Sequence, residues 1–141
     1  MPLEHLIYVS SATHEMDTPA LDAILAAAHR NNPPKGLTGM LLYARGSFLQ
    51  ILEGEPAAID ETFARISRDP RHRGLIEIER APIEARSFAK WSMGFRRLGE
   101  AETTTHPGFA PVFTQGLDAG PLGIRPGLAL DLLRSFAEDA R

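Results

Sequence analysis

The sequence predicts a single α+β domain, in which one β-sheet carries two helices on the same face. Two observations support this prediction. The hydrophobic period switches repeatedly between two residues and about 3.6 residues along the chain, as expected when strands alternate with helices. The chain has 141 residues, 43% of them hydrophobic and 23% charged, which is typical of one globular domain with a substantial core.

The N-terminal elements are a strand and a helix. Residues 6–11 (LIYVSS) are short, apolar and aromatic, which indicates a strand. A helix is expected over 17–32, where Pro19 suits the first turn. Its apolar residues recur at helical spacing: Leu21, Ile24, Leu25 and Ala28. The following PPKG ends the helix, because proline lacks a backbone donor and disfavours helix in the residue before it.

A hairpin and a second helix follow. Residues 37–43 (LTGMLLY) and 47–53 (SFLQILE) are apolar runs joined by ARG, which indicates an antiparallel pair of strands. Pro56 opens a helix, and the turn-rich, basic segment 67–74 (SRDPRHRG) ends it. The apolar face of this helix consists of Ile59, Phe63 and Ile66.

Two more strands complete the predicted sheet. Residues 75–83 (LIEIERAPI) alternate with period two, and residues 90–98 do the same, with Trp91, Met93 and Phe95 expected on one face. The resulting β-α-β-β-α-β-β order contains the ferredoxin-like split βαβ pattern, which puts both helices on one face of the sheet. The first strand is then expected beside the third.

The C-terminal region is expected to cover the other face of the sheet. Three of the predicted strands are apolar on both faces, which indicates that neither face is solvated. After a Gly/Pro-rich stretch over 99–127, a helical pattern aligns Leu128, Leu132, Leu133 and Phe136. We therefore divide the chain into a sheet-and-helix unit, 1–97, and a linker with a helical cap, 98–141.

Composition and missing motifs exclude several function classes. A net charge of −3 without a Lys/Arg stripe argues against a nucleic-acid partner, and the lack of cysteine excludes thiolate catalysis. There is no membrane-length apolar run and no signal-peptide pattern, so we expect a cytoplasmic protein that does not insert into a membrane. Metal-ligand histidine spacing and the common nucleotide and hydrolase motifs are missing, so no enzyme is predicted.

Four polar residues at buried-looking positions need partners. They are Tyr8, Asn31, Asn32 and Gln50. A buried glutamine amide left without partners costs about 1–3 kcal/mol. Each residue alone is best explained by a structural role, such as a helix cap for the asparagines. Together they can surround a groove between the two helices, because the fold places Tyr8 near Gln50, and such a set can orient a planar heterocycle.

Several ordered motifs make the sequence resemble the BLUF family, blue-light sensors that use flavin. The motifs are IYVSSAT, NNPPKGLTGMLLYARGSFLQILEG, RISRDPRHRG and RSFAKWSMGF, and they extend from Leu6 to about Phe95. The short tail is similar to that of the stand-alone, BlrB-like members. The resemblance implies a ferredoxin-like fold with flavin bound between the two helices.

The resemblance also implies a role for each matching position. Tyr8 would donate an electron and a proton to excited flavin, and Gln50 would bridge Tyr8 and the flavin ring. Reversal or tautomerisation of the Gln50 amide would then give a red-shifted signalling state. Trp91 and Met93 match the pair of family residues of which one packs beside this glutamine.

The remaining matching positions are implied to bind the cofactor. Asn32 would bond the flavin ring, and Asn31 would lie at its polar edge or by the ribityl chain. The loop by the ribityl and phosphate end would supply Asp69, Arg71 and His72. FAD is the expected cofactor and FMN is the alternative.

The implied function is that of a photoreceptor without enzymatic activity, which signals to a separate downstream protein. Whether the chain forms a homodimer stays open. Two other functions also stay open at this point. An acylphosphatase-like hydrolase would need a phosphate-binding loop after the first strand, but SSATHEMD has neither glycine nor arginine. A small-ligand-binding regulatory module without flavin would use the asparagines only as caps.

Overall fold

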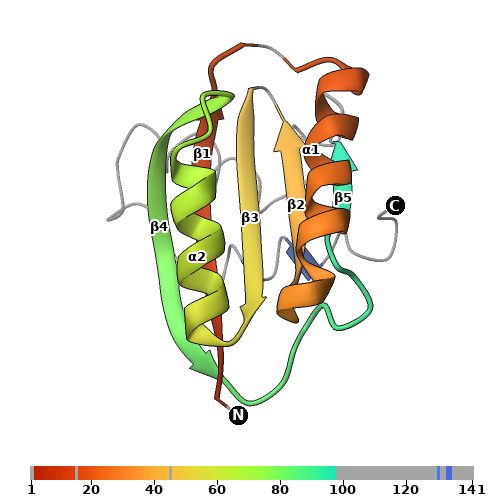
Figure 1. Cartoon of the computed structure of the whole chain (residues 1–141). Coiled ribbons are helices and arrows are strands. Elements are labelled where there is room, and N and C mark those ends of the chain that lie inside the picture. Colours follow the sequence, from red (N-terminus) through yellow and green to blue (C-terminus); the bar gives the residue numbers. More distant parts are fainter. Residues whose placement is uncertain (1, 15, 45, 98–129, 131–132, 135–141) are drawn as a thin grey trace.

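A computed structural model of the chain describes residues 2–14, 16–44, 46–97, 130 and 133–134. Within this part, β-strands and helices alternate in the predicted order (Figure 1). The elements are β1 (Leu3–Ala12), α1 (Thr18–Asn31), the 3-10 helix η1 (Pro33–Lys35), β2 (Thr38–Ala44), β3 (Ser47–Gly54), α2 (Pro56–Ser67), β4 (His72–Ile83) and β5 (Gly94–Arg97).

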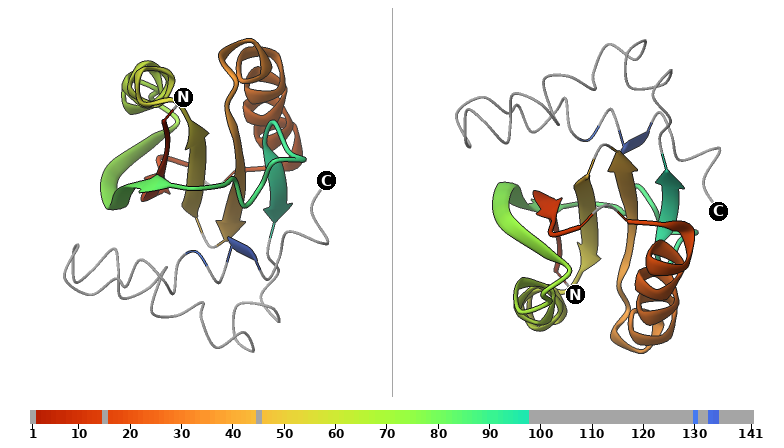
Figure 2. Two further views of the ribbon diagram at one scale, coloured as in Figure 1. Left: turned by 90° about the horizontal axis from the view of Figure 1, so that it is seen from below. Right: turned by 90° about the horizontal axis from the view of Figure 1, so that it is seen from above.

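The five described strands form one mixed sheet in the order β4-β1-β3-β2-β5. All neighbours are antiparallel except β2 and β5, which are parallel. Both α1 and α2 lie on the same side of this sheet, here called the helix face (Figures 1 and 2). The predicted α+β, ferredoxin-like architecture is therefore confirmed, including the pairing of the first strand with the third.

Alternation along the strands builds a core on each face of the sheet. In β1, Leu6 belongs to the cluster under the helices, whereas Ile7 and Val9 belong to the cluster on the opposite side, here called the far face. Both clusters are buried, which explains why the central strands are apolar on both faces. In α1 the apolar residues recur at helical spacing, so that Leu21 and Leu25 are buried against the helix face of the sheet.

The far face is covered in part by the C-terminal region. Leu133 is fully buried in the far-face cluster, and Leu130 packs against it. This short segment lies on the side of the sheet opposite α1 and α2 (Figure 2). The other tail residues that we expected here, Leu128, Leu132 and Phe136, lie outside the described residues.

The buried carboxylate of Glu53, at the end of β3, joins this strand to the segment before β5. It accepts hydrogen bonds from the backbone N–H groups of Ser87 at 2.7 Å and Phe88 at 3.0 Å, and from the Thr38 hydroxyl at 2.9 Å. These donors satisfy a charge that would otherwise be costly to bury. Phe88 is thereby held where its ring enters the far-face cluster.

The prediction that Trp91, Met93 and Phe95 share one face is wrong for Trp91. Met93 and Phe95 belong to the cluster on the helix face, but Trp91 packs against the far-face cluster. The strand was expected from residue 90, whereas β5 begins at Gly94. Residues 91–93 lie outside the strand, and the Trp91 N–H bonds the Phe88 carbonyl at 3.0 Å, so a period of two does not apply there.

Candidate functional site

A cavity of about 490 Å³ lies between α1, α2 and the helix face of the sheet. Its volume is in the range of roughly 300–1,000 Å³ that is typical of small-molecule sites. Tyr8 and Gln50 line it from β1 and β3, while Ile24 and Ile66 line it from the two helices. A planar ligand entering here would meet both apolar and polar side chains from the helices and from the sheet.

Tyr8 and Gln50 form a direct pair across two neighbouring strands. They are register partners in the β1–β3 ladder, and their side chains are 2% and 7% exposed. The Tyr8 hydroxyl donates to Oε1 of Gln50. Burial raises the pKa of the Tyr8 hydroxyl, and the negative charge of Asp69 raises it further. Tyr8 is therefore a neutral phenol at physiological pH.

The other end of the Gln50 amide reaches Met93. Its Nε2 donates to Sδ of Met93 at 3.4 Å. A glycine in the intervening strand β2 makes room for the methionine: a Cβ atom at Gly39 would lie 3.2 Å from Cε of Met93. The same Cβ would lie 2.1 Å from the carbonyl oxygen of Ile51, so no other residue fits position 39 without a shift of the backbone.

The C-terminal end of α1 holds the Met93 segment in place. Nε2 of His29 lies 2.9 Å from the Met93 carbonyl oxygen, and because that oxygen can only accept, the imidazole donates. The Asn32 amide donates to the neighbouring Ser92 carbonyl at 2.8 Å. Asn31 also lines the cavity, at the end of the same helix. The position of the Met93 sulfur beside Gln50 therefore depends on α1 as well as on the sheet.

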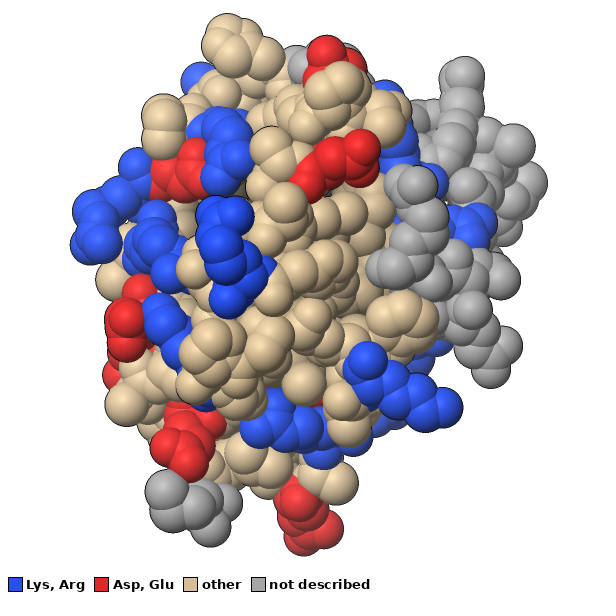
Figure 3. Space-filling model, turned by 45° about the vertical axis from the view of Figure 1, so that its right-hand side comes forward, with Lys and Arg blue, Asp and Glu red and all other residues tan. Residues whose placement is uncertain are grey.

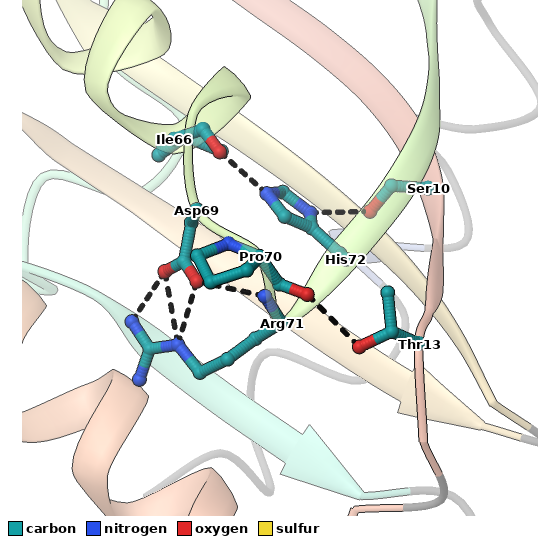
Figure 4. Close-up of polar contacts among 7 residues, drawn as sticks. All are labelled: Ser10, Thr13, Ile66, Asp69, Pro70, Arg71 and His72. Atoms are coloured by element: carbon teal, nitrogen blue, oxygen red, sulfur yellow. Dashed lines mark hydrogen bonds and ion pairs between the residues drawn. The ribbon is translucent and has the colours of Figure 1, made fainter.

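The loop after α2 presents an ion pair at one end of the cavity. Arg71 donates through Nε, at 2.9 Å, and through its backbone N–H, at 2.9 Å, to the carboxylate of Asp69 (Figure 4). The guanidinium group of Arg71 lowers the pKa of Asp69, despite partial burial of the carboxylate. Both groups are therefore charged at neutral pH, and the loop conformation is fixed by their contact.

His72 connects three elements through its two ring nitrogens (Figure 4). Nε2 lies 2.6 Å from the Ile66 carbonyl oxygen, which can only accept, so Nε2 carries a proton. Nδ1 lies 2.9 Å from the Ser10 hydroxyl, which can donate to it when the ring is neutral. The Thr13 hydroxyl adds a bond of 2.9 Å to the Pro70 carbonyl, so the residue that follows β1 is also joined to the loop.

The charged residues that line the cavity are concentrated in one part of it. The buried polar residues that line it from β1, β3, α1 and α2 are neutral: Tyr8, Gln50, Asn32 and Thr62. Apart from Asn31 on α1, its other polar residues extend from the end of α2 to the start of β4 and are mainly cationic: Arg65, Arg68 and Arg71, with Asp69 and His72. In the space-filling view, Lys and Arg side chains gather beside an extended area without charged residues (Figure 3). Such a site suits a neutral ring that carries an anionic extension.

Comparison with known proteins identifies the family. The sequence model described as "Sensors of blue-light using FAD" matches residues 3–94, well over half of the chain. The chain belongs to the BLUF family. The photoactivated adenylate cyclase subunit beta of Euglena longa is 39% identical over 92 residues, which are 64% of this chain and 11% of that protein. The matched part of this chain thus corresponds to about a tenth of the length of that cyclase subunit.

Solved BLUF structures have the same architecture. The dark-state structure of BlrB, a BLUF protein, has a TM-score of 0.74 at 30% identity, and the match covers 98% of this chain and 97% of that chain. Klebsiella pneumoniae BlrP1 with FMN and cyclic diGMP has a TM-score of 0.67 at 30% identity, covering 97% of this chain and 35% of that chain. The predicted family and the predicted function class, a flavin-based blue-light sensor, are confirmed. BLUF domains signal to effector domains, and no helix in the described ranges is long and apolar enough to span a bilayer.

The cavity of this BLUF domain brings together seven of the predicted site residues. They are Tyr8, Asn31, Asn32, Gln50, Asp69, Arg71 and His72. Met93 contacts Gln50, whereas Trp91 packs on the far side of the sheet and does not line the cavity. Sequence reasoning missed Thr62, although it lies three residues after Ile59 and four before Ile66 on α2. That helical spacing was the signal that could have placed it toward the sheet.

The chemistry of the cavity fits a flavin. Apolar side chains on both helices can pack against a planar ring, and the neutral polar groups match ring carbonyls and nitrogens. The cationic residues at the end of α2 match phosphates. The hydroxyl of Thr62, a cavity-lining residue, is buried without a hydrogen-bond partner among the residues that the structure describes, which leaves it free to bond a ligand.

Proposed function

We propose that this BLUF domain binds FAD, or alternatively FMN, without a covalent bond in the cavity described above, and that Gln50 is its switch. The observation that carries the proposal is the continuous chain of side-chain contacts from Tyr8 through Gln50 to Met93 at the sheet side of the cavity. Bound flavin would supply blue-light absorption and an acceptor for an electron and a proton.

Tyr8 is the proposed donor. Its hydroxyl is buried and protonated, so loss of an electron from the ring would make this proton strongly acidic in a place without bulk water. Gln50 Oε1 is the hydrogen-bond partner of that proton. A phenol held in this way releases its electron and proton together, and no charge is left unbalanced in the buried site.

Gln50 is suited to two hydrogen-bonded states. Its amide has donors at one end and an acceptor at the other, so reversal would turn Nε2 toward the Tyr8 hydroxyl, whose oxygen can accept, while Oε1 would need another donor because a thioether has no proton to give. Its Nε2 bonds a thioether, which is a weak acceptor. Loss of this contact therefore costs little. We assign Met93 as the residue that packs beside Gln50, and we give Trp91 an indirect role through the backbone of residues 91–93.

The remaining residues are assigned to cofactor binding. Asn32 and Asn31 would hold the polar edge of the ring system from the end of α1. The ribityl and phosphate end would meet Asp69, Arg71 and His72, which are held by the contact of Arg71 with Asp69 and by the bond of His72 to α2. Arg65 and Arg68 add positive charge to the same end of the cavity. This arrangement favours a flavin nucleotide over free riboflavin.

We propose that the output is binding rather than catalysis. Residues 1–97 would form the photosensory unit, and residues 98–141 the linker and cap through which a signal reaches a separate cytoplasmic protein. The match of the family model to residues 3–94 supports this division. Formation of a homodimer is compatible with the same output.

The test is optical. The purified protein is expected to be yellow, and blue light should shift its flavin absorption band reversibly to longer wavelength. The light-minus-dark difference spectrum measures this shift, and its decay in darkness measures recovery. A colourless protein that binds neither FAD nor FMN would contradict the proposal and would favour a flavin-free ligand-binding module or a hydrolase.

A further inference from the structure

Thr62 carries the one buried side-chain polar atom without a hydrogen-bond partner in the part of the chain that the structure describes. The residue is 2% exposed, belongs to α2 and lines the cavity. Its neighbour Phe63 contacts the ring of Tyr8, with centroids 5.2 Å apart. This turn of α2 therefore lies beside Tyr8, at the sheet side of the cavity.

A threonine inside a helix has an easy way to satisfy its hydroxyl. It can donate to the backbone carbonyl four residues earlier, as Ser67 does in the same helix toward Phe63 at 2.8 Å. Thr62 makes no such bond to the carbonyl of Ala58 or to any other described group. A hydroxyl buried without a partner reduces the stability of the protein, so its presence at the cavity wall calls for a partner inside the cavity.

We propose that the Thr62 hydroxyl donates a hydrogen bond to a ring carbonyl oxygen of bound flavin. The inference rests on the proposed function and adds to it a binding residue on α2. Thr62 belongs to the neutral set of buried polar groups, with Tyr8, Asn32 and Gln50, and not to the cationic end formed by Arg65, Arg68 and Arg71. A neutral hydroxyl suits a carbonyl, while phosphates are matched by the arginines.

Two substitutions at the same position test the assignment. Thr62→Val keeps the shape and replaces the hydroxyl by a methyl group, whereas Thr62→Ser keeps the hydroxyl and serves as the matched control. For Thr62→Val we expect dissociation constants for FAD and for riboflavin that are both raised about three- to tenfold, the loss of one neutral hydrogen bond. Thr62→Ser should stay within about twofold of the wild type.

Two further measurements separate a ligand contact from a structural role. The melting temperature of the flavin-free Thr62→Val protein should be equal to or above that of the wild type, because an unpaired buried hydroxyl has been removed. The infrared stretching band of a flavin carbonyl should move to higher frequency in Thr62→Val and remain in place in Thr62→Ser.

Other outcomes would overturn the assignment. Unchanged flavin affinity in Thr62→Val would mean that the hydroxyl bonds only water. A loss confined to FAD would place the contact at the phosphate or adenine end, and a lowered melting temperature of the flavin-free variant would show a packing role. A wild-type protein that bound no flavin would instead overturn the proposed function itself, together with this inference.

Discussion

The side-chain amide of Gln50 lies 3.4 Å from the sulfur of Met93, although β2 separates β3 from β5 in the sheet. At its other end the same amide accepts a hydrogen bond from the Tyr8 phenol. One partner is therefore a strong donor and the other a weak acceptor. The contact with Met93 is therefore the weaker of the two, and substitutions of Gln50 and of its two partners are informative.

Gln50→Leu should retain the fold and lose the photoresponse. Leucine has a similar volume and suits a buried strand, but the buried Tyr8 hydroxyl loses its acceptor, so the free energy of unfolding should fall by about 1–3 kcal/mol. Flavin should still bind through Asn32 and the cavity walls, but blue light should produce no red-shifted band. Light-minus-dark spectra of variant and wild type measure the difference. A normal difference band in Gln50→Leu would show that the switch lies elsewhere.

Tyr8→Phe should separate flavin binding from photochemistry. The substitution removes one hydroxyl and keeps the ring that packs against Phe63. The protein is expected to purify yellow, and its flavin spectrum should not respond reversibly to blue light because the proposed donor is gone. Transient absorption after a blue flash tests for the missing step. Photocycling at the wild-type yield would assign the donor role to another residue, such as Trp91.

Met93 and Trp91 should differ in their effects. Met93→Leu removes the sulfur that faces Gln50, so the dark-state absorption maximum and the rate of dark recovery should both change. Trp91→Phe leaves the environment of Gln50 intact, since Trp91 packs on the far face. It should therefore leave the absorption maximum unchanged. Dark spectra and recovery kinetics of both variants are compared, and a larger effect of Trp91→Phe on the absorption maximum would refute the assignment of Met93.

The pKa of Tyr8 predicts a stability loss at alkaline pH. Burial raises this pKa above the value of 10.0 that applies to the unfolded chain, so the neutral phenol stabilises the fold fully below pH 10.0. As pH rises beyond that value, only the unfolded chain releases the proton. Stability should then fall by up to about 1.4 kcal/mol per pH unit relative to Tyr8→Phe. Urea unfolding of both proteins across this range checks the sign, and parallel pH profiles would contradict it.

Leu133→Ala should destabilise the domain, although the residue lies far along the chain from the sheet. Its side chain is fully buried in the far-face cluster, so truncation should cost about 2–5 kcal/mol. The neighbouring Arg134 is exposed and makes a bond of 2.9 Å to the Ser87 hydroxyl. Arg134→Ala is therefore a suitable control, with an expected change within about 0.5 kcal/mol. Equal stability of both variants and the wild type would show that the segment is only tethered.

Sequence patterns predicted the helices because each buries one side, which leaves a readable period. The central strands β1, β2 and β3 are buried on both sides and were predicted from their short apolar runs. The pairing of Tyr8 with Gln50 followed from the strand order and is confirmed by the register. The position of Trp91 could not be predicted in this way. It depends on a turn stabilised by hydrogen bonds from Trp91 to Phe88 and from Gly39 to Trp91, which no period encodes. His29 was missed for a similar reason, since its partner is a backbone carbonyl remote in sequence.

β3 lines the cavity through Gln50, and through the carboxylate of Glu53 it also bonds the segment before β5. Gln50 faces α1 and α2, and three residues later the same strand holds the backbone of Ser87 and Phe88. Phe88 in turn shares a cluster with Leu133. A rearrangement at Gln50 that displaced β3 along its length would therefore also displace Ser87 and Phe88. The displacement would reach Leu133 in the C-terminal region through the far-face cluster. The contacts of Glu53 and Phe88 therefore connect the cavity side of the sheet to its opposite face.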